Sequence, residues 1–315
     1  MNDIFEIVKE NDFKRLKDNL KYVNINAKDE TSFSLLHYAV MNNNLEMVRY
    51  LLLNNIDKNI SNDYLNTPLH LSVIYNFLGI FKVLVKAGAE INLKNKDGET
   101  PLMLAIKLKR DEMSEILLSL NAKIDIKNNK KENIIFLATH SSNISLIEET
   151  LNKNPELINS RDMYNNTLLH EAVKLGNFQV TKLLLNRGIL PNELNCDLET
   201  PIFNAARSNN LEITSLLIDS GALLEFKNRF RETVYDLGDE RYVDFITFES
   251  NSVKYLNYQR NYPLIRAVIL NDKEMFNKYF NNVEMNKKDD HNLNAYDWAK
   301  RYNRQDFIKL LHKSK

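Results

Sequence analysis

The sequence predicts an all-α protein in which pairs of short helices stack into a solenoid. Three observations predict this fold class. A short motif, "NTPLHLSVIYN" at residues 66–76, returns along the chain at nearly constant intervals. Its Thr-Pro step is a helix-start signal, because the hydroxyl can cap a free amide and proline is preset for the first turn. Glycine or asparagine follows most copies of this motif at fixed distances. These residues adopt the left-handed conformation that is common at helix ends.

The recurrence is read by aligning the chain on His70. The equivalent positions are His37, Met103, Phe136, His170, Phe203, Asp236, Ile265 and Asp297. The spacings from His37 onward are 33, 33, 33, 34, 33, 33, 29 and 32 residues. A 33-residue period made of two helices and a turn resembles the ankyrin-repeat family. The resemblance implies an ankyrin-repeat α-solenoid of about ten units, each a helix-turn-helix with a short β-hairpin finger.

Each element of the unit has its own signal. The unit that opens at Thr67 starts a first helix there, turns at a corner, continues as a second helix and runs out extended before Thr100. A left-handed residue is expected at each corner: Asn43, Asn76, Gly176, Asn209, Asn271 and Asn303, with Lys109 and Ser142 as less ideal substitutes. A second left-handed residue is expected where each second helix ends: Asn55, Gly88, Asn121, Asn154, Gly188 and Gly221.

Two parts of the array are expected. Residues 1–249 form the main array, including N-terminal capping helices, because a stack of repeats needs polar ends. Residues 250–315 form two further ankyrin-like units with a C-terminal cap, continuous with the array after an irregular junction. The junction, 235–262, has a shortened interval and three crowded tyrosines, Tyr255, Tyr258 and Tyr262. These tyrosines either fill the core or form a local partner site.

Composition excludes several classes of partner. Lys plus Arg and Asp plus Glu both number 42, so overall charge favours neither nucleic acid nor a membrane surface. The single Cys196 excludes an intramolecular disulfide and fits a reducing compartment. We find no signal peptide and no apolar stretch of membrane-spanning length. We therefore expect a cytoplasmic monomer, with delivery into a host cell as an open alternative.

The sequence contains no phosphate loop, zinc-protease helix, Cys-x-x-Cys pair or nucleophile elbow. We therefore expect no catalytic residue, no cofactor and no metal. His37, His70 and His170 lie on different units, roughly a repeat apart, whereas zinc ligands must converge to about 2 Å from one ion. The family resemblance implies instead that this histidine ties adjacent repeats together by hydrogen bonds.

Function in such a scaffold is decided by its surface. The resemblance implies that partners contact the finger tips and the exposed side of the first helices. At the finger tips this implication includes Glu99, Tyr164, Glu199 and Phe230. The candidate partner-binding residues are the apolar ones toward the N-terminus: Phe33, Tyr38, Met41, Tyr64, Leu71, Ile74, Tyr75, Leu104 and Leu108. The prediction is a non-catalytic scaffold that binds a protein or an extended peptide. The alternatives are a pathogen or symbiont factor that docks on host proteins, and an enzyme-recruiting adaptor that uses the 235–262 segment.

Overall fold

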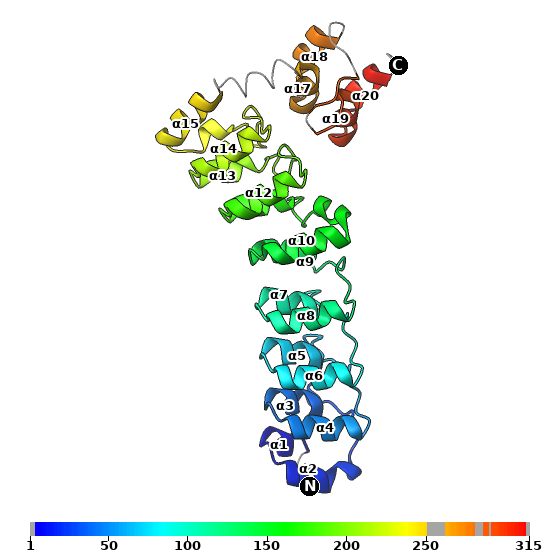
Figure 1. The fold of residues 1–315 in the computed structure, drawn as a ribbon. Coiled ribbons are helices and arrows are strands. Elements are labelled where there is room, and N and C mark those ends of the chain that lie inside the picture. Colours follow the sequence, from blue (N-terminus) through cyan, green and yellow to red (C-terminus); the bar gives the residue numbers. More distant parts are fainter. Residues whose placement is uncertain (1–3, 251–261, 281–285, 290, 313–315) are drawn as a thin grey trace. The chain divides into compact units, whose positions relative to one another are not determined.

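The computed structural model describes residues 4–250, 262–280, 286–289 and 291–312 (Figure 1). The chain divides into two compact units, Met1–Met163 and Tyr164–Lys315. In both units the described residues form paired α-helices joined by turns, without a β-strand; Lys28 and Ser34 form an isolated antiparallel bridge. The all-α solenoid class is confirmed. Within the same described ranges, no helix has the length and apolar character to span a membrane.

The first unit contains five helix pairs and two short 3₁₀ helices, in chain order. They are α1 (Ile4–Lys9), α2 (Phe13–Asn19), η1 (Leu20–Tyr22), α3 (Leu35–Met41), α4 (Leu45–Leu53), α5 (Pro68–Ile74), α6 (Leu78–Lys86), α7 (Pro101–Lys107), α8 (Asp111–Ser119), α9 (Ile134–His140), α10 (Ile144–Lys153) and η2 (Pro155–Asn159).

The second unit continues the same alternation of first and second helices. Its described elements are α11 (Leu168–Lys174), α12 (Phe178–Asn186), α13 (Ile202–Arg207), α14 (Leu211–Asp219), η3 (Val234–Asp236), α15 (Glu240–Ser250), α17 (Pro263–Leu270), α18 (Lys273–Phe280), α19 (Ala295–Arg301) and α20 (Gln305–His312). A short 3₁₀ turn, η3, takes the place of a first helix before α15.

Hydroxyl and amide side chains start the helices. Ser34, Thr67, Thr100 and Thr167 each accept a hydrogen bond from the backbone N–H three residues on, and so cap a first helix. The second helices α2, α4, α10, α12 and α14 start on other polar side chains that accept in the same way, namely Asp12, Asn44, Asn143, Asn177 and Asn210, whereas α6 and α8 have no side-chain cap. The many asparagines of the sequence therefore cap helices as well as turning corners.

The corner predictions are confirmed at every position. Asn43, Asn76, Gly176, Asn209, Asn271 and Asn303 have positive φ, as do the less ideal Lys109 and Ser142. Five of the six predicted ends of second helices are also left-handed, and Asn154 is the exception, with φ −143°. Asn154 precedes Pro155, whose ring disfavours helical conformations at the preceding residue. The chain continues there as η2.

The core lies between stacked first helices and the second helices behind them. First helices of neighbouring units contact one another in the series α1, α3, α5, α7 and α9. In the first helices from α3 to α13, a small residue lies at the same place and is fully buried: Ala39, Ser72, Ala105, Ala138, Ala172 and Ala205. Small side chains let neighbouring backbones approach, and the larger apolar residues fill the space on either side.

The fingers, which connect each second helix to the next first helix, are not β-hairpins. Each finger is a five-residue loop that begins with Asn or Asp, as at Asn62–Asn66 and Asn95–Glu99. The first residue's N–H donates to the fifth residue's C=O, and its side-chain oxygen accepts from the third and fifth N–H groups. The fourth N–H donates to the first residue's C=O, so the loop closes on two backbone hydrogen bonds and no strand ladder forms. The same loop recurs at Asp29, Asn128, Asn195, Asn228 and Asp289.

Neighbouring fingers are joined by a ladder of backbone hydrogen bonds. In the first unit Lys96 N–H donates to Tyr64 O, Asn129 N–H to Asp97 O, and Met163 N–H to Lys130 O. In the second unit Cys196 and Arg229 donate to the preceding finger in the same way. Asparagine amides add a parallel tie, with Asn59 Oδ1 accepting from Glu90 N–H at 2.8 Å. The ladder therefore fixes the tips of these five fingers relative to the ones before them.

Candidate functional site

The candidate site is the finger face, defined here as the finger tips and the exposed sides of the first helices. Tyr64 and Tyr75 are 61% and 44% exposed on it. Five other predicted contact residues are partly exposed: Phe33, Tyr38, Met41, Ile74 and Leu108. Leu71 and Leu104 were predicted to contact a partner, but they are buried, at 5% and 6% exposure. Leu71 lies in α5 and Leu104 in α7, and their burial assigns both to the core.

Two aromatic pairs shape the finger face near the N-terminus. Phe33 and Tyr38 have ring centroids 5.5 Å apart, and the Tyr38 hydroxyl donates to Asp29 Oδ2 at 2.5 Å. Tyr75 stacks on Phe77 at 5.7 Å. The sequence did not single out Phe77, because it follows the corner residue and occupies the N-cap of α6 rather than a first helix. These pairs leave rigid rings partly open to solvent.

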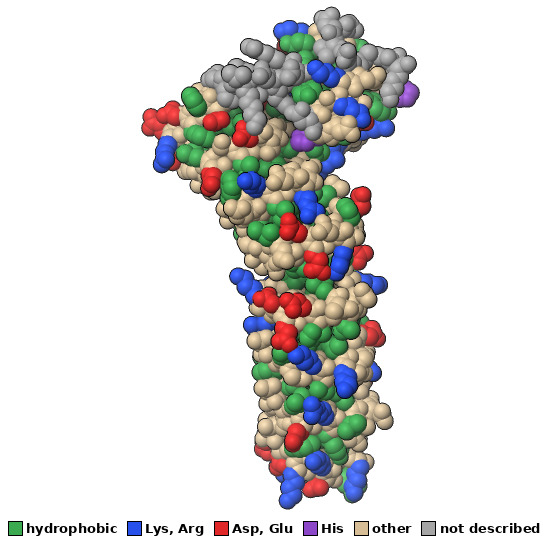
Figure 2. All heavy atoms as spheres, in the orientation of Figure 1, with side chains coloured by type: hydrophobic (Ala, Val, Ile, Leu, Met, Phe, Trp, Pro, Cys, Tyr) green, Lys and Arg blue, Asp and Glu red, His purple; other side chains and the backbone are tan. Residues whose placement is uncertain are grey.

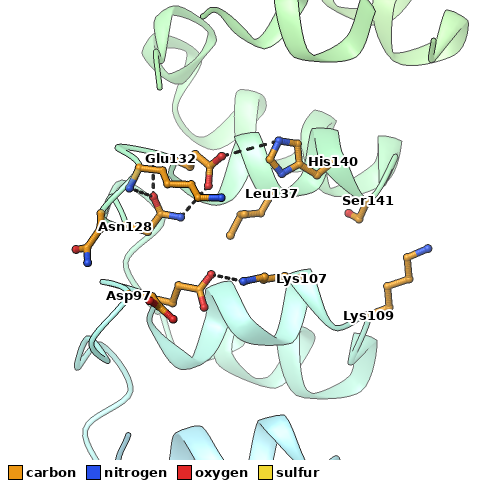
Figure 3. A pocket seen from close by; sticks show the side chains of 11 residues that line it. Asp97, Lys107, Lys109, Asn128, Glu132, Leu137, His140 and Ser141 are labelled. Carbon is orange, nitrogen blue, oxygen red and sulfur yellow. Dashed lines mark hydrogen bonds and ion pairs between the residues drawn. The ribbon is translucent and has the colours of Figure 1, made fainter. Parts of the chain in front are cut away.

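A pocket of about 470 Å³ lies on the finger face between α7 and α9 (Figure 3). Fingers and first helices line it and the second helices contribute no side chain to it, so it opens on the predicted binding side. Leu137 provides apolar surface within it. In Figure 3 the finger residues Asp97 and Asn128 lie at one end and Lys109 lies at the other.

Two of the three carboxylates that line this pocket are engaged inside the protein. Glu99 was expected at a finger tip, yet it is 4% exposed and accepts from Lys107 Nζ at 2.8 Å. Glu132 is 9% exposed and accepts from Asn128 Nδ2 at 2.8 Å. His140 Nε2 lies 4.0 Å from the other Glu132 oxygen. These acidic side chains therefore hold each finger against its first helix.

Two lysines of the same pocket have no carboxylate partner within the described part of the chain. Lys109 is at the corner after α7, and Lys130 is at the tip of the next finger. Lys130 is exposed, and neither ammonium group forms an ion pair with a described residue. Over the face of the molecule in Figure 2, acidic and basic side chains are interspersed. The cationic character at this pocket is therefore local.

The second unit repeats the bond between finger and first helix. Glu199, predicted at a finger tip, is 5% exposed and pairs with Arg207. Burial acts to raise the pKa of Glu199, but hydrogen bonds from Arg207 and Asn228 outweigh it and lower the pKa. Tyr164 and Phe230 are 60% and 66% exposed at the tips, as expected. The exposed surface of these fingers therefore includes aromatic rings, together with the Asp197–Arg229 ion pair.

The three histidines are structural. His70 Nδ1 accepts from Thr67 N–H at 3.2 Å, and its Nε2 lies 3.2 Å from Glu99 O of the next finger. A backbone N–H can only donate and a carbonyl can only accept, so the ring is neutral with its proton on Nε2. His37 and His170 make the equivalent bonds to Asn66 O and Glu199 O. Each ring thus ties its own helix start to the following finger, which confirms the predicted role.

Packing residues replace histidine elsewhere. Met103, Phe136 and Phe203 occupy the equivalent positions and are at most 1% exposed. Among the described residues, no group of three or more His, Cys, Asp or Glu side chains is placed to hold a metal ion. The histidine position is therefore a buried packing position in every unit that has a regular first helix between α3 and α13.

Part of the irregular junction lies outside the described residues. Tyr255 and Tyr258 are among those outside, whereas Tyr262 directly precedes α17. On the N-terminal side, Tyr242 of α15 is fully buried, and its hydroxyl lies 3.0 Å from Thr214 Oγ1 of α14. Burial raises the pKa of Tyr242 to about 12. The described side of the junction therefore continues the packed array.

The profile of the ankyrin-repeat family, described as three copies of the repeat, matches residues 4–95, 36–128 and 135–228. These matches cover well over half of the chain. The chain belongs to the ankyrin-repeat family. Ankyrin repeats generally mediate protein–protein interaction and are typically non-enzymatic scaffolds.

A solved ankyrin-repeat structure agrees with this fold. It is the ankyrin repeat domain of Bcl-3, described as a unique member of the IkappaB protein family. The similarity has a TM-score of 0.56 and 23% identity, and it covers 70% of this chain and 100% of that domain. A search of curated proteins found no match to this sequence. At this identity the similarity supports the ankyrin fold alone.

Proposed function

We propose that this ankyrin-repeat protein is a non-catalytic scaffold that binds a protein or an extended peptide on the finger face of its first unit. The observation that carries the proposal is a series of partly exposed apolar side chains on three successive first helices and their corners. Tyr38 and Met41 come from α3, Ile74 and Tyr75 from the end of α5, and Leu108 from the end of α7.

Such a series is what a partner surface needs. Scattered exposed apolar residues are normal, whereas a contiguous row of them is typical of an interface. Stacked units place equivalent positions beside one another, and aromatic rings bury a large area with few rotatable bonds. The proposed contact residues are Phe33, Tyr38, Met41, Tyr64, Ile74, Tyr75 and Leu108. Leu71 and Leu104 are left out because they are buried.

The test uses tyrosines that the fold does not need. The variant Tyr64→Ser/Tyr75→Ser changes two side chains that are 61% and 44% exposed, so we expect little change in the thermal midpoint. Interface aromatics can each contribute roughly 2 kcal/mol or more, so partner affinity should fall at least tenfold. Tyr38 is less suitable, since its ring and hydroxyl are bonded within the fold.

The partner is first obtained by affinity capture from lysate of the source cells, with the intact chain as bait, and its affinity is then measured by biolayer interferometry. Tyr22→Ser/Leu53→Ser is the matched control, because both residues are exposed, at 72% and 81%, and lie outside the finger face. Equal losses of affinity in the two variants, or no loss in either, would contradict the proposal.

A further inference from the structure

We propose that the occupant of this finger face is an extended peptide with an apolar segment followed, or preceded, by acidic residues. The apolar segment lies over α3 and α5, and the acidic residues lie at the pocket between α7 and α9. This inference rests on the proposed function and adds the chemistry of the partner. The charges that line the two parts of the face carry it.

In the part over α3 and α5, the carboxylate bonded to the aromatic pair is engaged inside the fold, whereas the finger residues Glu30 and Asp63 are exposed. Asp29 is the carboxylate nearest to its aromatic pair, and it accepts from the Tyr38 hydroxyl, from the Thr31 hydroxyl and from backbone N–H groups. The Lys9 ammonium lies 3.9 Å from Asp29 and 5.1 Å from the Tyr38 ring centroid. With these charges compensated locally, the exposed rings favour apolar side chains.

The pocket between α7 and α9 is balanced in formal charge but not in accessible charge. Its lining includes Lys107, Lys109 and Lys130 and three carboxylates, Asp97, Glu99 and Glu132. Glu99 and Glu132 are the two buried carboxylates, and both accept hydrogen bonds inside the fold.

Asp97 is therefore the one carboxylate of this lining that is open to a ligand, against three lysines. Lys107 remains 53% exposed although it pairs with Glu99. A ligand carboxylate can approach Lys109 and Lys130 without displacing an internal ion pair.

Two further lysines extend this cationic region along the fingers. Lys96 and Lys131 are exposed in the fingers on either side of the pocket. Charges arranged in this way mainly speed association and select the partner, while the apolar contacts supply most of the affinity. A peptide that carried both features would match both halves of the surface.

The repeat geometry sets the spacing between the two features. Packed helices lie roughly 8–10 Å apart, and the pocket is about one and a half helix spacings from α5, so it lies roughly 12–15 Å beyond the Tyr75 ring. An extended chain spans about 3.3–3.6 Å per residue. The acidic residues of the peptide should therefore follow or precede its apolar anchor by roughly four positions.

The experiment selects peptides from a phage-displayed library of random 16-residue sequences against the full chain. Enriched peptides are synthesised with a fluorescein label, and their affinities are measured by fluorescence anisotropy. We expect an aromatic or aliphatic cluster and two or more acidic residues at the stated spacing. Enriched peptides that lack acidic residues, or a library that yields no binder, would overturn the inference.

Variants separate this inference from the proposed function. Lys109→Glu/Lys130→Glu should weaken binding of the enriched peptides at least tenfold. Lys14→Glu/Lys86→Glu is the control, because it makes the same change in net charge at exposed lysines of the second helices α2 and α6. Equal losses in the two charge variants would overturn the inference.

The variants distinguish a failure of this inference from a failure of the proposed function. Peptides that respond to Tyr64→Ser/Tyr75→Ser but not to the Lys109/Lys130 variant overturn the acidic half and leave the proposed function standing. Peptides that respond to neither variant overturn both. A 20-nucleotide single-stranded oligonucleotide that binds through Lys109 and Lys130 and displaces the peptides would show that the occupant is a nucleic acid.

Discussion

The buried histidines predict that the first unit loses stability as the pH falls below about 6.5. Burial lowers the pKa of both His37 and His70 from 6.5 to about 4, because a buried imidazolium loses its hydration and Nδ1 would lose its role as acceptor. Protons therefore bind the unfolded chain more tightly than the folded one. The stability that neutral histidine provides is fully present above pH 6.5 and is lost as the pH falls toward 4.

The magnitude follows from these values. At pH 5 about 97% of an unfolded histidine is protonated and about 10% of the folded one, which by linkage costs about 2 kcal/mol per histidine. Together His37 and His70 should remove about 4 kcal/mol between pH 7.5 and pH 5, a large fraction of the stability of a typical domain. Aspartate and glutamate change little above pH 5, so the histidines dominate this interval.

The assay is urea unfolding followed by far-ultraviolet circular dichroism at pH 7.5 and pH 5, with amide exchange of α3 and α5 read by mass spectrometry. The variant is His37→Gln/His70→Gln, because glutamine at this helix position can still accept from the N-cap N–H but does not titrate. It should be less stable than the natural chain at pH 7.5 and less sensitive to pH. His312→Gln, at an exposed histidine near the end of α20, is the control. If the double variant lost as much stability as the natural chain on acidification, the reasoning would be refuted.

Three further predictions concern the fingers and their bonds to the first helices. Asn95→Ala removes two hydrogen bonds to the Asn95 side-chain oxygen and should cost about 1–3 kcal/mol, measured by urea unfolding, with faster amide exchange in that finger. Lys131→Gly should stabilise the fold by about 0.5–1 kcal/mol. Lys131 has φ 62°, and glycine relieves the backbone strain of that conformation at some cost in chain entropy. An unchanged thermal midpoint would contradict this expectation. Glu199→Gln should destabilise the second unit at neutral pH, because the pKa of Glu199 is lowered in the fold and its ionised carboxylate therefore stabilises it. The variant should also lose less stability than the natural chain on acidification, and thermal melts at pH 7 and pH 4 test both expectations.

The helix pairs were predictable because their signals are local. A cap, a left-handed corner and a small buried residue each depend on a few neighbouring positions, and the 33-residue period repeats them. The prediction for Asn154 was wrong because the series was extended without weighing the proline that follows. The prediction of β-hairpin fingers was wrong because the segment before each first helix was interpreted as extended, whereas its aspartate or asparagine accepts hydrogen bonds from two backbone donors and closes a loop.

The candidate site was harder to predict than the fold. Equivalent repeat positions place Tyr38 and Leu71 in the same series, yet Tyr38 is half-buried and Leu71 is in the core. The exposure of each side chain depends on its orientation between neighbouring units. The repeat period of the sequence carries no information about that orientation. The acidic finger residues Glu99 and Glu199 were expected to face a partner, but each has a basic residue eight positions later on its own first helix. That spacing is visible in the sequence and would have indicated an internal pair.

The ladder between finger tips determines where this chain can change length. Five fingers donate their second N–H to the third carbonyl of the finger before them, so one residue added inside such a finger would shift a donor away from its acceptor. The unit that spans 34 residues instead of 33 carries its irregularity outside the finger, in the segment 153–159. There η2 accommodates it, and Met163 still donates to Lys130 O. Insertions of a tag or a loop at this segment should therefore be tolerated, whereas single-residue insertions in a finger should disrupt assembly of the neighbouring units.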